Sequence, residues 1–189
     1  QLSIVLGQLK KNRAAIIGGV ILIIIVILVL LAPLIAPYHY ADQNRSESLQ
    51  GFSKKHLLGT DNLGRDLLSR LLYGGRLSLL IGIGSTLLSA VIGMAIGIPA
   101  GYFGGKTDIL LMRFIDIYSS IPPLALSIAL SSVLGPGIGN CILALGISNI
   151  GSFARMTRIQ FLTASGEDYV EAARAINCSN LKTIFKYIL

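Results

Sequence analysis

Four long apolar runs with little or no charge constrain this chain more than any other feature. They cover residues 14–35, 77–102, 109–134 and 138–153. The hydrocarbon core of a bilayer is about 30 Å thick and takes roughly 20 apolar residues in one helix. A helix suits this setting because it satisfies its own backbone hydrogen bonds within one segment. The sequence therefore predicts an all-α fold, a polytopic transmembrane helical bundle, in which the first run is a permanent anchor and not a cleaved signal sequence.

The composition limits the classes of function open to the chain. Hydrophobic residues make up 53% of it and charged residues 13%, and the formal net charge is +7. Basic flanks of membrane spans that meet anionic lipid account for this charge, so membrane lipid, and no nucleic acid, is expected as a partner. His39 and His56 have no companion spacing for a metal site, and the positions of Cys141 and Cys178 do not suggest a disulfide. No nucleophile with a base and an acid is evident. No enzyme activity, metal or cofactor is therefore expected in this chain itself.

The distribution of Lys and Arg predicts the orientation, because short cytoplasmic segments carry the excess of these residues. Both the tail before the first run and the segment after the fourth are basic. The residues concerned are Lys10, Lys11 and Arg13 in the tail, and Arg155, Arg158, Arg174, Lys182 and Lys186 in the later segment. Both ends are therefore expected in the cytoplasm. The predicted parts are an N-terminal tail and anchor (1–35), an outer loop (36–76) and a core (77–189) with a cytoplasmic loop at 158–189.

The outer loop carries an amphipathic pattern. Thr60 or Asp61 can cap a helix, and Asp66 stands four residues before Arg70, the spacing of an ion pair on one helix face. The apolar side of this helix would be formed by Leu63, Leu67 and Leu71. The pattern predicts a helix that begins near residue 60 and lies in the outer interface, although a solvated connector would show the same periodicity.

The residues after the fourth run predict a helix-turn-helix elbow. Ser165 followed by Asp168 has the spacing of a capping box, which predicts a helix start. The predicted apolar face of this helix consists of Tyr169, Ala172, Ala173 and Ile176. Asn177 follows it, and Asn adopts the left-handed conformation at helix C-termini second only to Gly. Ser179 can then cap a second short helix.

The second run contains small residues at every fourth position, namely Gly93, Gly97 and Gly101. This spacing places them on one helix face and predicts close contact with a neighbouring helix.

The third run contains a carboxylate and two consecutive prolines. Asp116 should face protein or a water-filled cavity, as part of a translocation pathway. Alternatively, Asp116 lies near the cytoplasmic interface, where it is hydrated, pairs with Arg113 or bonds to Ser119. Pro122 and Pro123 should bend or interrupt the span, and this bend would serve either a gate or ordinary packing.

Two stretches of this sequence resemble a known family. Glu171-Ala172-Ala173, followed after three residues by Asn177, resembles the EAA loop of membrane subunits in ABC importers, where Gly stands at the last position. A second signature is similar to the one before the second span in the branch of these importers that carries dipeptides, oligopeptides and nickel. It consists of Leu58-Gly59-Thr60-Asp61, Gly64-Arg65-Asp66, Ser69-Arg70 and Arg76-Leu77-Ser78, with Leu57 where that branch often has Pro. The resemblance covers nearly the whole chain.

The resemblance implies a type I ABC importer permease fold in the inner membrane of a bacterium or archaeon. The family has about six spans that cross the bilayer, so this chain, which begins at Gln1, is expected to be a fragment without the last two. The implied partners are ABC ATPase subunits that bind ATP and Mg²⁺, a paralogous permease and an extracytoplasmic substrate-binding protein. Glu171, Ala172, Ala173 and Asn177 would couple ATPase closure to alternating access. The alternative is an ion-gradient-driven secondary transporter, which predicts further intramembrane acids or broken helices in repeated halves.

Overall fold

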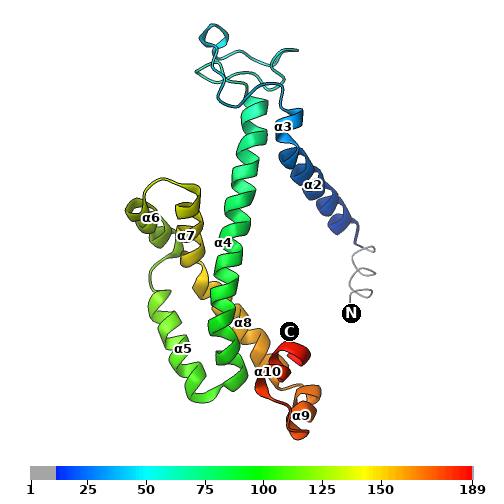
Figure 1. The fold of residues 1–189 in the computed structure, drawn as a ribbon, viewed down its shortest axis with the longest axis vertical. Helices are drawn as coiled ribbons and strands as arrows, with labels where there is room; N and C mark the ends of the chain where they lie inside the picture. Colours follow the sequence, from blue (N-terminus) through cyan, green and yellow to red (C-terminus); the bar gives the residue numbers. More distant parts are fainter. Residues whose placement is uncertain (1–11, 189) are drawn as a thin grey trace. The chain divides into compact units, whose positions relative to one another are not determined.

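The structure is a computed structural model that describes residues 12–188. All regular elements in this range are helices, which confirms the predicted all-α fold (Figure 1). The chain divides into two compact units, with the boundary along the sequence between Leu80 and Ile81. The long helix α4 (Leu67–Phe103) contributes residues to both units.

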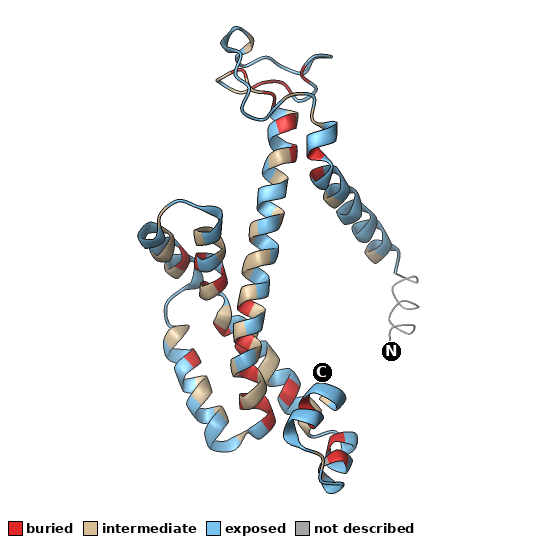
Figure 2. Cartoon of the chain, viewed as in Figure 1, coloured by how far each residue is buried: buried red, intermediate tan, exposed pale blue. Residues whose placement is uncertain are grey.

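The first unit begins with an apolar helix. α2 (Arg13–Leu30) is capped by Asn12, whose side-chain oxygen accepts hydrogen bonds from the backbone of Ala14 at 3.1 Å and Ala15 at 3.3 Å. A short helix, α3 (Ala32–Ile35), follows it. Nearly all residues of α2 are exposed, as the pale blue colour of this helix in the cartoon of Figure 2 shows. Exposed apolar side chains along a whole helix suit contact with lipid or with another apolar helix.

The segment after α3 differs from its prediction. The structure has one short 3-10 helix there, η1 (Arg45–Glu47), and no helix starts at residue 60. The carboxylate of Asp61 accepts hydrogen bonds from the backbone N–H groups of Leu63 (2.8 Å) and Arg65 (3.0 Å), and Gly59 and Gly64 have positive φ angles. These side-chain bonds and left-handed residues favour turns over a helix. The predicted helix therefore begins later, at Leu67.

The second unit contains the remaining helices. They are α5 (Gly105–Tyr118), α6 (Pro123–Leu134), α7 (Ile138–Ser148), α8 (Ile150–Ser165), α9 (Asp168–Ala175), α10 (Asn180–Thr183) and η2 (Ile184–Ile188). Among the described residues, α2 and α4 are long and apolar enough to cross a membrane, and α5 with α6 forms a third candidate bent by 69°. The prolines 122 and 123 lie at this bend, as the sequence predicted. The predicted fourth span is divided at Asn149 between α7 and α8.

Helix α4 packs closely on α8 along the predicted face of small residues. A Cβ atom at Gly97 would lie 2.5 Å from the carbonyl oxygen of Ala154, and one at Gly101 would lie 2.5 Å from the carbonyl oxygen of Arg158. A Cβ at Gly93 would be 2.9 Å from the backbone nitrogen of Ala154. These distances leave no room for a side chain, so the predicted close contact is confirmed, with α8 as the partner.

A buried ionic cluster holds the start of α4. One carboxylate oxygen of Asp66 accepts hydrogen bonds from the backbone and hydroxyl of Ser69, both at 2.8 Å, and the other lies 2.9 Å from Nδ1 of His56. Burial would raise the pKa of Asp66, but the hydrogen bonds from Ser69 and His56 outweigh it and lower that pKa. The predicted pair of Asp66 with Arg70 is wrong, because Asp66 caps the helix and Arg70 pairs with Asp61.

Substitution of Gly97 by Ala tests the contact between α4 and α8. The new methyl group meets backbone atoms that cannot give way, and overpacking of this kind costs about 1–3 kcal/mol. Thermal unfolding of the protein in detergent should therefore show a lower Tm. Gly82→Ala is the matched control on the same helix, since nothing lies within 4 Å of the position. Its Tm should stay the same or rise, because Ala favours helix over Gly. An unchanged Tm for Gly97→Ala contradicts the packing.

Acid is expected to loosen the segment around Asp66. Because the folded-state pKa of Asp66 is lowered, its contribution to stability is complete above the ordinary value of about 3.9 and is lost as the pH falls below that value. The protection of backbone amides 44–69 from hydrogen exchange, corrected for intrinsic rates, should therefore decrease as the pH falls below this value. Asp66→Asn should reduce protection at pH 7 by about 1–3 kcal/mol and weaken the acid dependence. The exposed Asp42→Asn serves as control, and equal protection in both variants contradicts the prediction.

Candidate functional site

The predicted elbow is present after α8 and consists of α9, the turn at Asn177 and α10. Its start differs from the prediction. Ser165 is the last residue of α8 rather than a cap, and its hydroxyl oxygen is buried. The carbonyl oxygen of Glu167 instead accepts the first hydrogen bonds of α9, from the backbone of Val170 at 2.9 Å and of Glu171 at 3.2 Å. The capping-box prediction is therefore wrong, because α8 continues through Ser165, the residue that was expected to cap α9.

The turn of the elbow has the predicted geometry. Asn177 has a φ of 57°, and the backbone N–H of Cys178 donates to the carbonyl of Ala173 at 3.1 Å. This bond, from the residue after the left-handed one back to the last turn, is that of a Schellman motif. Asn177 thus adopts the left-handed conformation that the sequence predicted for it. α10 then starts after Ser179, whose carbonyl, rather than its hydroxyl, accepts the hydrogen bonds of Thr183.

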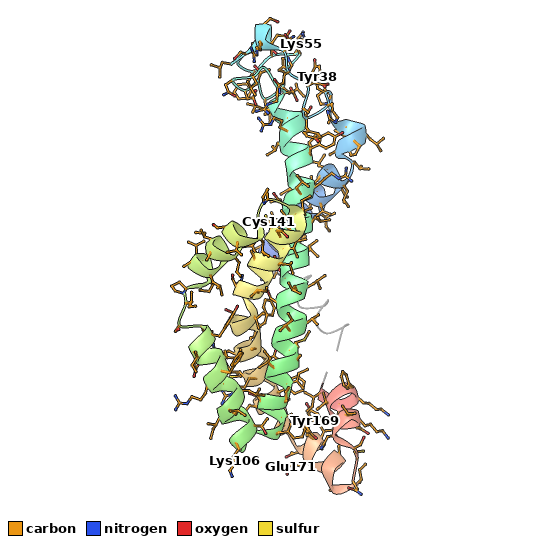
Figure 3. All side chains as sticks on the ribbon, turned by 60° about the vertical axis from the view of Figure 1, so that its left-hand side comes forward. Tyr38, Lys55, Lys106, Cys141, Tyr169 and Glu171 are labelled. Carbon is orange, nitrogen blue, oxygen red and sulfur yellow. The ribbon has the colours of Figure 1, made fainter. Side chains whose placement is uncertain are left out.

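The two faces of α9 have different environments. Val170 is 0% exposed and Ala173 is 3% exposed, so these residues pack against the rest of the unit. The opposite face is open and contains Asp168, Tyr169, Glu171, Ala172 and Ala175, and the exposed Ile176 follows directly after the helix. Figure 3 shows Tyr169 and Glu171 on the elbow. The predicted apolar face is therefore divided: Ala173 is internal, whereas Tyr169, Ala172 and Ile176 are available to a partner.

Ala175 is the residue of the open face that the sequence prediction missed. It follows Asp168 and Ala172 along the same row of the helix, at spacings of seven and three residues. This periodicity could have identified it.

The elbow is attached to the ends of α4 and α8. Tyr102 of α4, Phe161 of α8 and Ile184 of η2 form a buried apolar cluster. The hydroxyl of Tyr102 donates a hydrogen bond to the side-chain oxygen of Asn180 at 3.1 Å. Contacts from α10 and η2 therefore connect the elbow with the helix that precedes the bent span.

The residues predicted for a translocation pathway lie apart from the elbow in the sequence and in their contacts. Asp116 is in the last turn of α5, with an exposed side chain that accepts a hydrogen bond from Arg155 at 3.5 Å. Its partner is thus Arg155 of α8, rather than Arg113 or Ser119. Pro122 precedes α6 and Pro123 begins it, so both lie at the bend that follows Asp116.

Comparison with known proteins gives two matches to families. Residues 93–189 match the family described as binding-protein-dependent transport system inner membrane component, and residues 1–51 match the N-terminal TM domain of oligopeptide transport permease C. The first match includes α8 and the whole elbow.

Individual relatives are similar over nearly all of the chain. A dipeptide transport system permease protein of Alkalihalophilus pseudofirmus is 38% identical over 182 residues, which are 96% of this chain and 60% of the relative. A glutathione transport system permease protein of Pectobacterium atrosepticum is 34% identical, covering 95% of this chain and 60% of the relative. An oligopeptide transport system permease protein of Bacillus subtilis is 33% identical, covering 96% and 60%.

The chain spans about 60% of the length of these relatives. Its apolar helices, its elbow and the match over residues 93–189 lead to one assignment. The chain belongs to the family of inner membrane components of binding-protein-dependent transport systems.

Proposed function

We propose that this chain is the permease subunit of an ATP-driven importer, and that the open face of α9 receives an ATPase subunit. The observation that carries the proposal is the two-sided elbow. Val170 and Ala173 fix α9 to its own unit, while Glu171 and Ala172 on the other side are exposed. A small residue such as Ala172 lets a partner surface approach the helix backbone closely, and the attachment behind it passes a displacement on to the unit.

The family description supports the proposed assembly. A binding-protein-dependent system contains a substrate-binding protein, and we propose that it delivers substrate on the extracytoplasmic side. The ATPase subunits would bind ATP and Mg²⁺ on the cytoplasmic side, and a paralogous permease would complete the pathway. The basic residues around the elbow and before α2 support a cytoplasmic position for the elbow and for the N-terminal tail. The proposed location of the subunit is the cell membrane of a bacterium or archaeon.

Peptides are the proposed substrate class. The names of the three cited relatives refer to dipeptides, glutathione and oligopeptides, all of which contain amide bonds. Nickel transport stays a prediction from the resemblance alone.

The proposed mechanism is mechanical. Closure of the ATPase pair would displace α9, and the Schellman turn at Asn177 keeps the angle between α9 and α10 fixed. The cluster of Tyr102, Phe161 and Ile184 would then carry the displacement to α4 and α8. Movement of these helices would open the pathway to one side and close it to the other.

The neighbouring alanines of α9 provide the sharpest test. Ala172→Asp adds a charge to the exposed face, so the full-length subunit should still fold but bind its ATPase subunits at least about tenfold more weakly, a loss of about 1.4 kcal/mol. Ala173→Asp buries a charge and should instead lower the amount of folded subunit. Co-purification with the ATPases and a thermal unfolding assay measure the two effects separately.

A third variant and an uptake assay complete this test. Ala41→Asp makes the same change at an exposed residue of the first unit and should leave ATPase binding unchanged. Peptide uptake into vesicles, supplied with ATP or with an ion gradient alone, decides between the importer and the secondary transporter. Uptake on the gradient alone, with normal uptake by Ala172→Asp, contradicts the proposed function.

A further inference from the structure

A bidentate ion pair connects α5 with α8. The guanidinium of Arg158 donates two hydrogen bonds to Asp108, from Nε to Oδ1 at 2.5 Å and from Nη2 to Oδ2 at 2.6 Å. The Asp108 side chain is 16% exposed and that of Arg158 is 30% exposed. Paired donors on a planar guanidinium fix both the distance and the orientation of the two groups. The second charge pair between these helices, Arg155 with Asp116, has a single bond of 3.5 Å and is more exposed, so it constrains them less.

Arg158 lies where three helices meet. Its backbone carbonyl is in close contact with Gly101 of α4, its side chain holds Asp108 of α5, and its own helix leads directly into the elbow. A displacement of α8 therefore acts on α4 through backbone packing, and on α5 through this bidentate ion pair together with the weaker pair of Arg155 and Asp116.

Helix α5 is also the first half of the bent span. It ends at Tyr118, and the break before Pro123 separates it from α6 at an angle of 69°. The hydroxyl of Tyr118 donates to the carbonyl of Ile147 in α7, so α5 is bonded to other helices near both of its ends. A helix held at its ends and followed by a bend can move as a rigid piece, with the change of angle absorbed at the bend.

We propose that the ion pair of Arg158 and Asp108 couples the elbow to the bent span. This inference rests on the proposed function and names two positioning residues for it. Displacement of the elbow moves α8, and the ion pair makes α5 follow, so that the bend before Pro123 changes its angle. Without the pair, the elbow still binds the ATPase, but α5 no longer follows α8.

The test uses the complete transporter, reconstituted with its ATPases and binding protein. Asp108→Asn and Arg158→Lys remove the bidentate geometry, and Lys keeps the positive charge. Both should co-purify normally with the ATPases, and peptide uptake per ATP hydrolysed should fall at least about fivefold, the lower end of typical coupling between sites. The exchanged pair, Asp108→Arg with Arg158→Asp, should recover most of this ratio. Arg113→Gln, on the exposed side of α5, is the matched control and should match wild type.

The outcomes separate the two proposals. If the wild-type transporter shows no ATP-driven uptake, the proposed function fails, and the coupling role fails with it. If wild type transports and Asp108→Asn keeps the wild-type ratio of uptake to ATP hydrolysis, only the coupling role is overturned. Loss of ATPase binding in both single variants, without recovery in the exchanged pair, also overturns it and assigns the ion pair to folding. A lower ratio that the exchanged pair restores supports the inference.

Discussion

The close contact between α4 and α8 is the constraint on which the second unit depends. With no side chain between the backbones at Gly97 and Gly101, the separation of the two helices is set by backbone atoms, which do not rearrange as side chains do. α8 can therefore serve as a rigid support for its neighbours, and α5, α7, α9 and η2 all contact it. The elbow takes its position from this support, because its helices α9 and α10 are too short to be stable alone.

Polar interactions add specific connections to this apolar packing. In the second unit three of them involve at least one residue near a helix end, namely Tyr102 with Asn180, Tyr118 with Ile147 and Arg158 with Asp108. Apolar contact alone would allow helices to slide or rotate past one another, whereas these bonds have defined partners and directions. The same helices are thus joined both by apolar packing and by hydrogen bonds with defined partners, as a unit that transmits movement requires.

Periodicity and backbone preference predicted much of this structure, and long-range contacts account for most errors. The glycines of α4, the bend at Pro122 and the left-handed Asn177 follow from local rules. The late start of α4 also has local causes, because the carboxylate of Asp61 bonds to the backbone of the next residues and Gly59 and Gly64 have positive φ angles, but the leucine periodicity does not reveal them. The inward position of Ala173 and the pair of Arg158 with Asp108 depend on which helices become neighbours, and a single sequence does not contain that information.

The central claim is that the elbow, α8 and α5 move as one piece. Pulsed electron paramagnetic resonance tests it most directly, with spin labels at Leu110 on α5 and Leu181 on α10, which are 73% and 69% exposed. In the complete transporter the account predicts one narrow distance distribution that is the same in the resting and the ATP-bound states. A distance that changes between the two states, in a wild-type background with intact uptake, would contradict the claim.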